Sequence, residues 1–240
     1  MSYQQMALVY DLLMKDAPYD QWVTWTKHMV SHYHSGAQRL LDLGCGTGEI
    51  TTRLAGHGWQ LTGVDLSEDM LTMAASKDQT IQWLRQDMTE LKGLHDYDCI
   101  ISFCDVLNYI TDVPSLEAVF KHAYQALNER GLFLFDVHSV EHLINDLCGQ
   151  TFAEVYDDLS YVWFCDPGEK EYSVIHDLTF FVRHHQDYQR FDEQHFQQGY
   201  NLETLQTAIE KAGFTLQLVT ADFSVNPADQ GDRLFFVCQK

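Results

Sequence analysis

Hydrophobic positions follow two alternating spacings between residues 38 and 137. Short apolar runs of strand length are separated by segments in which apolar residues recur every three or four positions, as on one face of a helix. The predicted strands are 38–43, 59–65, 81–87, 97–104 and 131–137. The predicted helices are 49–57, 67–76 and 115–127. Strands that alternate with helices across short connections predict an α/β fold with a doubly wound, mostly parallel sheet.

The chain begins with a stretch, residues 1–35, that is predicted to be helical and is rich in aromatic side chains. Leu8, Leu12 and Leu13 fall at helical spacing within it. The aromatic side chains are Tyr3, Tyr10, Tyr19, Trp22, Trp25 and Tyr33. We therefore expect helices that precede the first strand of the sheet.

A different pattern begins after the fifth predicted strand. From about residue 150 to residue 198 the chain carries aromatic segments with strand-like alternation, and residues 166–170 (DPGEK) form a turn between two of them. The segments are TFAEVYD, SYVWFC, YSVIHDLTFFVR and YQRFDEQHFQ. Alternating segments joined by short turns predict an antiparallel β insertion after strand five.

Helical spacing returns after this insertion. Asn201 is the expected N-cap of the last helix and Gly213 its C-terminal stop. Two more strands are predicted near 214–220 and 233–239, which gives the main sheet seven strands. The expected domains are 1–149 for the N-terminal helices and the core, 150–198 for the antiparallel cap, and 199–240 for the return to the core.

The composition indicates a cytoplasmic, globular protein. Of the 240 residues, 45% are hydrophobic, which is enough to bury a core, and no apolar run is long enough to span a membrane. The N-terminus has no basic stretch of the kind that starts a secretory signal. The six cysteines include no C-x-x-C pair, which favours reduced thiols over disulfides or a zinc site. We expect no membrane association.

The charge balance bears on the choice of partner. Thirty-five acidic residues against fifteen basic ones give a net charge of −20. A field of this sign repels phosphate backbones, and proteins that bind nucleic acids usually show a cluster of Lys and Arg. No such cluster occurs in the sequence, so we expect no nucleic-acid partner. Solubility alone also explains the acidity.

The stretch LLDLGCGTGEI, residues 40–50, places three glycines directly after a predicted strand. A strand that turns straight into a helix leaves the first N–H groups of the helix able to bind a ligand, and glycines permit the sharp turn. The spacing is G-x-G-x-G, one residue shorter than the G-x-G-x-x-G of dinucleotide-binding loops. The candidate ligand contacts are Asp42, Gly44, Cys45, Gly46 and Gly48.

Five segments in this order resemble motifs of the class I S-adenosylmethionine-dependent methyltransferases. They are LLDLGCGTGEI, VDLSEDML, RQDM, YDCIISFCDVLNYI and LNERGLFLFDVHS. The resemblance covers residues 37–137 and, loosely, the C-terminal helix and strands. It implies a Rossmann-like fold and S-adenosylmethionine as the cofactor. The opening segment, VYDLLMKDAPYDQW, resembles the N-terminal helix of a subgroup that contains small-molecule methyltransferases and uncharacterised bacterial proteins.

The resemblance implies roles for residues at the ends of the second and third strands. Asp65 would accept hydrogen bonds from both ribose hydroxyls, which are donors. Leu66 and Met70 would lie against the face of the adenine. Asp87 would accept a hydrogen bond from the adenine amino group, and the backbone N–H of Met88 would face a ring nitrogen of the adenine.

Two further cofactor contacts follow from the resemblance, and several residues have a second interpretation. Tyr10 would approach the methionine end of the cofactor, and Cys104 lies in the fourth-strand motif. Met70 could instead be a core residue of its helix. Asp87 could cap a turn, and Asp42 could be a buried acid that is bonded to the glycine loop.

The acceptor is expected to lie between the core and the insertion. Asp105, Asn108 and Tyr109, in the loop after strand four, are the candidate substrate contacts. His138, just past strand five, is the candidate general base. We expect residues 150–198 to select the acceptor, and the alternative is that they form a homodimer interface.

The sequence HSVEH, residues 138–142, matches the H-x-x-E-H pattern of inverted zinc peptidases. Three fixed positions arise easily by chance in a chain with twelve histidines, and no third ligand is evident. We therefore predict no metal site.

Together these patterns predict an enzyme that transfers a methyl group from S-adenosylmethionine to a small-molecule acceptor, either an amine or a hydroxyl. One alternative is an RNA or protein methyltransferase. The other is a regulatory module that binds S-adenosylmethionine without turning it over.

Overall fold

The computed structural model describes residues 9–240, and a seven-stranded sheet forms the centre of the fold. The strands lie in the order β10-β11-β5-β4-β1-β2-β3. Neighbours from β5 to β3 are parallel, whereas β11 is antiparallel to both β5 and β10. The strands are β1 Arg39–Leu43, β2 Gln60–Asp65, β3 Gln82–Arg85, β4 Tyr97–Ser102, β5 Leu127–His138, β10 Thr215–Ala221 and β11 Arg233–Gln239. The predicted doubly wound, mostly parallel sheet is confirmed.

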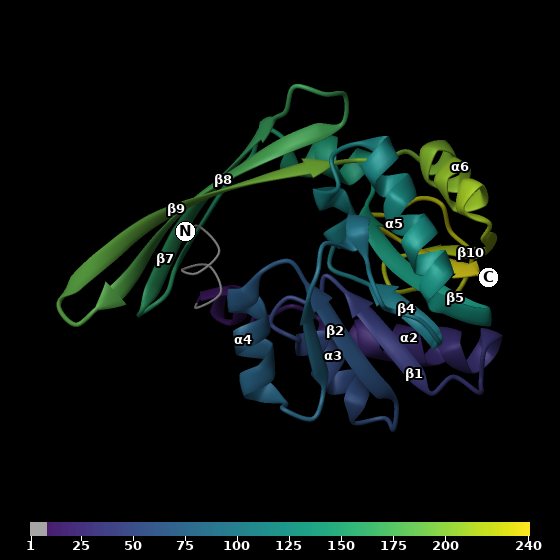
Figure 1. The fold of residues 1–240 in the computed structure, drawn as a ribbon. Coiled ribbons are helices and arrows are strands. Elements are labelled where there is room, and N and C mark those ends of the chain that lie inside the picture. Colours follow the sequence, from purple (N-terminus) through teal and green to yellow (C-terminus); the bar gives the residue numbers. More distant parts are fainter. Residues whose placement is uncertain (1–8) are drawn as a thin grey trace.

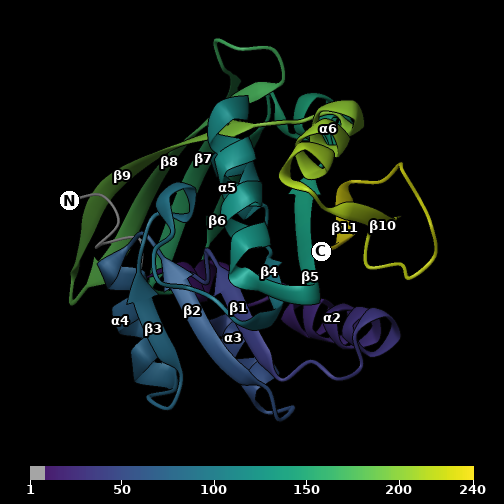
Figure 2. The same ribbon diagram turned by 45° about the vertical axis from the view of Figure 1, so that its right-hand side comes forward.

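Helices cover both faces of this sheet (Figures 1 and 2). α5 and α6 pack on one face, and α2 and α3 pack on the other. The helices are α2 Tyr19–Tyr33, α3 Glu49–Ala55, α4 Glu68–Lys77, α5 Val113–Ala126 and α6 Leu202–Ala212, with short turns η1 Met88–Glu90, η2 Val106–Tyr109 and η3 His142–Leu147. No helix within residues 9–240 is both long and apolar enough to cross a membrane.

The two helical layers explain the unbroken apolar runs of the central strands. Successive side chains of a strand point to opposite faces of the sheet. Leu41 packs with α5 and α6, whereas its neighbour Leu40 packs with α2 and α3. Ile100 and Ile101 of β4 divide in the same way, and all four side chains are fully buried. Strands buried on both faces read as continuous hydrophobic runs.

Helix ends follow the predicted caps. The Ser67 hydroxyl accepts the backbone N–H three residues on at 3.3 Å, and the Asn201 side chain does the same at 2.8 Å. Gly213 ends α6 with φ +102°. The α5 helix begins at Val113, two residues before the predicted start, because Asp112 accepts the N–H of Ser115 at 2.8 Å and caps it.

Several predicted boundaries shift, among them the start of β5, which lies at Leu127, four residues before the predicted one. The predicted N-terminal helices appear within the described residues as a short helical turn at 9–13 and as α2, with Pro18 between them. Tyr3 and Leu8, which the sequence predicts to be helical, lie outside the described residues. α3 ends at Ala55, two residues early, and β4 ends at Ser102 because the next-but-one residue, Cys104, has φ +62° and leaves the strand.

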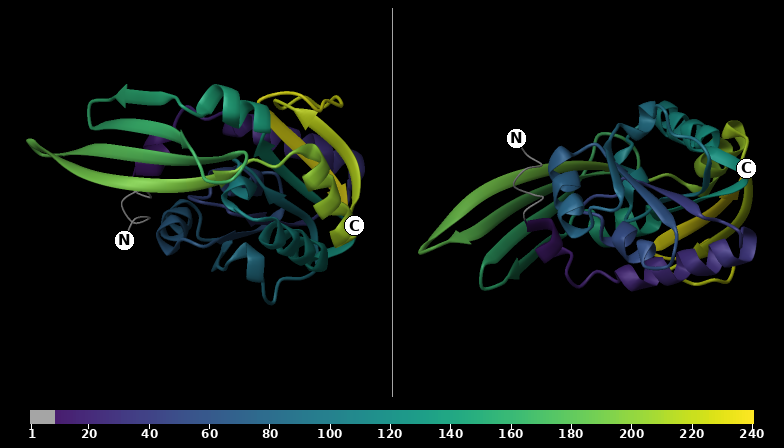
Figure 3. Two further views of the ribbon diagram at one scale, coloured as in Figure 1. Left: turned by 90° about the horizontal axis from the view of Figure 1, so that it is seen from above. Right: turned by 60° about the horizontal axis from the view of Figure 1, so that its bottom comes forward.

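The insertion after β5 is a separate antiparallel sheet, which we call the cap sheet. Its strands are β6 Thr151–Val155, β7 Leu159–Pro167, β8 Ser173–His184 and β9 Asp187–Gln198, paired in that order. Figures 1 and 3 show it projecting beyond the helical layers of the core. Its exposed apolar side chains include Val155, Phe164 and Phe196. The predicted insertion is confirmed, and a homodimer through it stays a prediction.

Candidate functional site

A cavity of about 990 Å³, here called the cleft, opens at the carboxyl ends of the parallel strands. It lies between the neighbouring strands β1 and β4, where the strand order of the sheet reverses, which is the position at which open α/β sheets bind ligands. Its walls come from the loops after β1, β2, β3 and β4, from the first residues of β11, from the N-terminal segment and from the cap sheet. The volume is at the upper end of that of small-molecule sites, so a nucleoside and a second ligand could share it.

The glycine loop after β1 borders the cleft. Gly44 has φ +78°, and a Cβ there would lie 2.4 Å from a methyl group of Val106, so only glycine fits. Gly46 has φ +53°, and a Cβ there would meet nothing within 4 Å, so its backbone faces open space. Gly48 lies outside the cleft lining, where a Cβ would meet the Trp83 ring at 2.7 Å. The loop therefore combines close packing below with an open ligand face above.

Asp65 ends β2 and holds two backbone groups of the site. One carboxylate oxygen accepts the N–H of Gly46 and the other accepts the N–H of Ser67, each at 2.8 Å. Burial raises the pKa of Asp65, although these hydrogen bonds oppose the rise. Leu66 and Met70, the predicted adenine contacts, line the cleft beside it, the first exposed and the second buried. The structure thus brings the predicted ribose and adenine residues together.

Asp42 near the end of β1 and Cys45 within the glycine loop are two further predicted contacts. Asp42 is buried and accepts the hydroxyl of Thr51 at 2.6 Å. Burial raises its pKa to about 7, against the effect of that hydrogen bond. Burial also raises the pKa of the Cys45 thiol. Both residues line the cleft, and Asp42 is buried as its alternative interpretation held, although its bond is to Thr51 of α3 rather than to the glycine loop.

Asp87 and Met88 follow β3 and line the cleft. One carboxylate oxygen of Asp87 accepts two hydrogen bonds from Thr89, one from its backbone N–H at 2.8 Å and one from its hydroxyl at 2.7 Å. Asp87 therefore caps the turn η1, as the alternative interpretation held. It also lies in the part of the cleft where the adenine contact is expected. A cap and an adenine contact are compatible, because a carboxylate has two oxygens with several lone pairs.

The N-terminal segment closes the cofactor side of the cleft. Tyr10 lines it, and burial raises the pKa of its hydroxyl. The next residue, Asp11, accepts the hydroxyl of Thr47 in the glycine loop at 2.5 Å and pairs with Lys77 of α4 at 2.6 Å. The Tyr19 hydroxyl is buried at the cleft and has no hydrogen-bond partner among residues 9–240. An unpaired buried hydroxyl at this position is suited to a ligand.

A cluster of charged residues lies in the part of the cleft formed by the loop after β4, the end of β5 and the start of β11, which we call the acceptor end. It consists of Asp105, Asp136, His138 and Arg233, the Asp105 cluster. Arg233 pairs with Asp105 at 3.0 Å and with Asp136 at 3.1 Å. Asp136 is fully buried, and it also accepts the indole N–H of Trp22 at 2.6 Å and the backbone N–H of Asp105 at 2.8 Å.

His138, the predicted base, belongs to this cluster. Its Nε2 lies 3.4 Å from a carboxylate oxygen of Asp105. Burial alone would raise the pKa of Asp105, but His138 and Arg233 hold that pKa well below its usual range. The His138 Nδ1 is buried and has no hydrogen-bond partner within the described residues. His138 is therefore placed to exchange a proton at the acceptor end.

The two other predicted acceptor contacts differ in position. Tyr109 lines the cleft, and its ring meets the His195 ring edge-to-face at 5.9 Å. Asn108 is fully buried and lies outside the cleft lining. Its side chain donates to the carbonyl of Gln198 at 3.0 Å and accepts the backbone N–H of His138 at 3.0 Å. Asn108 therefore joins the loop after β4 to the cap sheet and to β5, because both ends of its amide are used.

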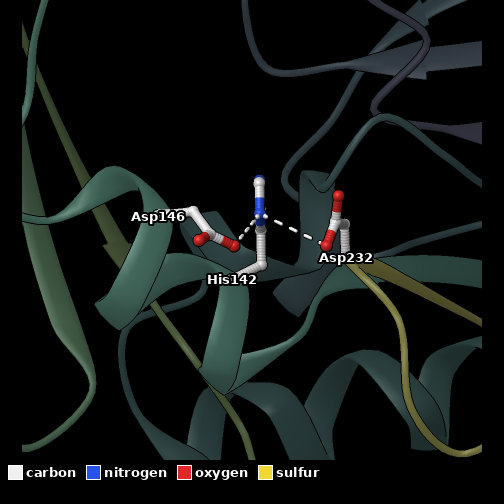
Figure 4. Close-up of side chains that lie close together, drawn as sticks. All are labelled: His142, Asp146 and Asp232. Atoms are coloured by element: carbon white, nitrogen blue, oxygen red, sulfur yellow. Dashed lines mark hydrogen bonds and ion pairs between the residues drawn. The ribbon is translucent and has the colours of Figure 1, made fainter.

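The histidines of HSVEH do not converge with its glutamate. His142 lies 3.1 Å from Asp146 and 3.8 Å from Asp232, and these three side chains are close enough to hold a cation (Figure 4). His138 belongs instead to the Asp105 cluster, and Glu141 is part of neither group. Exposed carboxylates commonly gather in this way without an ion.

Several residues of the acceptor end were not found from the sequence. They are Trp22, Asp136, Trp163, His176, Gln197 and Arg233. One signal was available for Arg233, which opens the last predicted strand. An antiparallel last strand begins at the edge where the parallel strands end, and therefore at the ligand site. The cap residues carry no such signal, because their alternation does not say which face covers the cleft.

Comparisons with known proteins agree with this geometry. A family model described as "Methyltransferase domain" matches residues 40–131. The chain is 43% identical over 245 residues to "Putative methyltransferase YqeM" of Bacillus subtilis (strain 168), which covers 100% of this chain and 98% of that protein. Thus the similarity extends across the cap sheet as well as the core.

Solved structures resemble the whole fold. The crystal structure of an S-adenosylmethionine-dependent methyltransferase from Clostridium acetobutylicum ATCC 824 superposes with a TM-score of 0.89 at 27% identity, covering 99% of this chain and 98% of that one. The sugar N-methyltransferase KedS8 from Streptoalloteichus sp. ATCC 53650 superposes with a TM-score of 0.82 at 20% identity, covering 97% of this chain and 92% of that one. The second likeness concerns the fold alone.

Proposed function

The chain belongs to the S-adenosylmethionine-dependent methyltransferases, and we propose that it methylates the nitrogen of a small, uncharged or cationic amine. The observation that carries this proposal is the charge of the cleft. Among the described residues that line it, Arg233 is the one Lys or Arg, and Asp105 and Asp136 already pair with it. The carboxylates of the lining are Asp42, Glu49, Asp65, Asp87, Asp105 and Asp112.

This charge distribution disfavours anionic acceptors and favours cations. A phosphate or carboxylate group would find no free cation in the lining, and the net charge of −20 would repel it during the encounter. An ammonium group at the acceptor end would meet the Asp105 carboxylate, which stays ionised because its pKa is held low. Tyr161 and Trp163 also line the cleft, and their ring faces attract cations.

The cofactor residues fit the nucleoside half of S-adenosylmethionine. Gly46 presents open backbone, Asp65 offers carboxylate oxygens for ribose hydroxyls, and Asp87 lies at the expected adenine position. The bound cofactor supplies a methyl group on a positively charged sulfur. The protein's own part is to hold the acceptor in line with that bond in a site from which water is excluded.

The acceptor nitrogen must be neutral before it can attack, because an ammonium has no lone pair. The His138 Nδ1 is suited to take this proton, since it is buried at the acceptor end and lacks a partner within the described residues. Asp105 is a poor base because of its low pKa, and it instead favours the positive charge that His138 acquires. The structural neighbour KedS8 is a sugar N-methyltransferase, which is consistent with an amine acceptor.

The acceptor class can be tested with matched small molecules. We expect labelled methyl transfer from S-adenosylmethionine to benzylamine or a related amine, at a kcat/KM at least about ten-fold above that for benzyl alcohol. We expect none to benzoate, since its carboxylate meets an acidic cleft. Pools of aliphatic and sugar amines, each with its alcohol and acid analogues, extend the comparison. Preferential methylation of the acids, or of RNA or protein, would refute the proposal.

A further inference from the structure

Three polar side chains on the inner face of the cap sheet form a chain of hydrogen bonds that ends on Asp105. Trp163 of β7 lies 3.0 Å from His176 of β8, measured from the indole Nε1 to the imidazole Nδ1. The His176 Nε2 lies 3.0 Å from the side-chain oxygen of Gln197 in β9. The Gln197 nitrogen donates to Oδ2 of Asp105 at 2.7 Å. These bonds cross the strands and join the cap sheet to the core.

The chemistry of the groups fixes the direction of every bond in this chain. An indole N–H can only donate, so Nδ1 of His176 must be the acceptor. A neutral imidazole with an accepting Nδ1 carries its proton on Nε2, which therefore donates to the Gln197 oxygen. The remaining end of the Gln197 amide is the NH2 group, and it donates to the carboxylate. No other assignment satisfies all the partners.

The environment favours the neutral form of His176 that this arrangement needs. His176 is 6% exposed and Gln197 is 3% exposed. Burial lowers the pKa of His176, with a smaller contribution from His138 in the same direction. Gln197, Asp105 and Asp177 oppose this effect. A proton on Nδ1 would also face the Trp163 N–H, so protonation would cost the chain its first bond.

Asp105 depends on such external contacts for its position. It follows Cys104, and both have positive φ, +62° and +54°, which is rare for residues other than glycine. Arg233 of the core binds one carboxylate oxygen at 3.0 Å, and Gln197 of the cap sheet binds the other. The carboxylate is therefore held between the core and the cap, and its position reports the position of the cap.

We propose that the Trp163–His176–Gln197 chain is a positioning device by which the cap sheet sets the Asp105 carboxylate for the acceptor. His176 is its central positioning residue, because it joins the two strands beside its own, β7 and β9, through one tautomer. The role of Asp105 toward the acceptor rests on the proposed function. The chain itself can be tested without any acceptor.

Nuclear magnetic resonance of the full chain with 15N-labelled histidine tests the chain directly. We expect His176 to show a protonated Nε2 and an unprotonated Nδ1 at pH 7, and Asp105→Ala to shift the Nε2 signal. Asp192→Ala, an exposed carboxylate of β9, should leave it unchanged. A proton on Nδ1 of His176 in the wild type would overturn the proposal, and so would an Nε2 signal that is the same in Asp105→Ala as in the wild type. Both outcomes can be read whether or not the protein has activity.

Kinetics with an amine identified as an acceptor test the functional half. We expect His176→Phe to lower kcat/KM for the amine about ten-fold, while the Kd for S-adenosylhomocysteine stays within two-fold. His184→Phe, an exposed position at the end of the same strand, is the matched control. If His176→Phe fails to fold, Gln197→Met is the second variant, because it removes the bonds that Gln197 makes to His176 and to Asp105. Wild-type kcat/KM in the folded variant would show that Asp105 needs no support from the cap.

Discussion

Replacing Arg233 with methionine is expected to lower the free energy of unfolding by about 3–5 kcal/mol. The Arg233 side chain is 16% exposed and stands between Asp105 and Asp136, of which Asp136 is fully buried. Without the guanidinium, the buried Asp136 carboxylate loses the cation beside it, and the Asp105 carboxylate keeps only its contacts with His138 and Gln197. The guanidinium also lies over the Trp22 ring, 5.4 Å from its centre, so the variant loses that contact too.

Denaturant unfolding measures this effect, and two further variants make it specific. Arg85→Met removes an exposed pair with Glu68 and should leave the unfolding midpoint close to that of the wild type. Arg233→Lys keeps the charge but not the two-pronged geometry, so it should fall between the wild type and Arg233→Met. A wild-type midpoint for Arg233→Met would mean that water or rearrangement solvates the two carboxylates.

Replacing Asp65 with alanine should weaken the binding of S-adenosylmethionine by about 2–3 kcal/mol, or roughly 30- to 150-fold. Ribose hydroxyls would lose a charged acceptor. The structure adds a second cause, because the same carboxylate accepts the N–H groups of Gly46 and Ser67 and so shapes the glycine loop. The stability of the fold should change less, since Asp65 lies at a strand end at the edge of the cleft.

Calorimetry measures this loss, with Glu68→Ala as the control. Glu68 is an exposed acid three residues away and lies outside the cleft lining, so its removal should leave the Kd unchanged. Burial raises the pKa of Asp65, so its carboxylate takes up a proton at a higher pH than an ordinary carboxyl with a pKa of about 3.9. As the pH is lowered, cofactor affinity should therefore begin to fall earlier than it would with an ordinary carboxyl. An Asp65→Ala protein with the wild-type Kd would contradict the ribose assignment.

The core of the fold was predictable because its signals are local. Runs such as 97–102 are apolar on both faces, and this pattern is set by the two helical layers that cover the sheet. Ser67 and Asn201 cap their helices through bonds to residues only three positions away. The predicted end of β4 was wrong by two residues, because the turn at Cys104 and Asp105 is stabilised by contacts from Asp136. No local pattern encodes such contacts.

The two ends of the cleft differ in the same way. The predicted cofactor residues Asp42, Gly44, Gly46 and Asp65 belong to short motifs at strand ends, and the structure places all four in the lining of the cleft. The acceptor end is assembled from segments far apart in the sequence, and the contact between Trp22 and Asp136 spans 114 positions. The sequence predicted only the residues of the loop after β4, of which Asp105 and Tyr109 line the cleft, whereas both ends of the Asn108 amide are used in structural bonds.

We propose that this cleft transfers a methyl group to a small amine and does not merely bind the cofactor. The most direct measurement incubates the protein with methyl-labelled S-adenosylmethionine and a small-molecule extract, and it follows the label by mass spectrometry. We expect an N-methylated small molecule together with S-adenosylhomocysteine, formed by the wild type and lost in Asp65→Ala at cofactor concentrations far below its weakened Kd. Cofactor that binds in calorimetry while no small molecule gains the label would contradict the account.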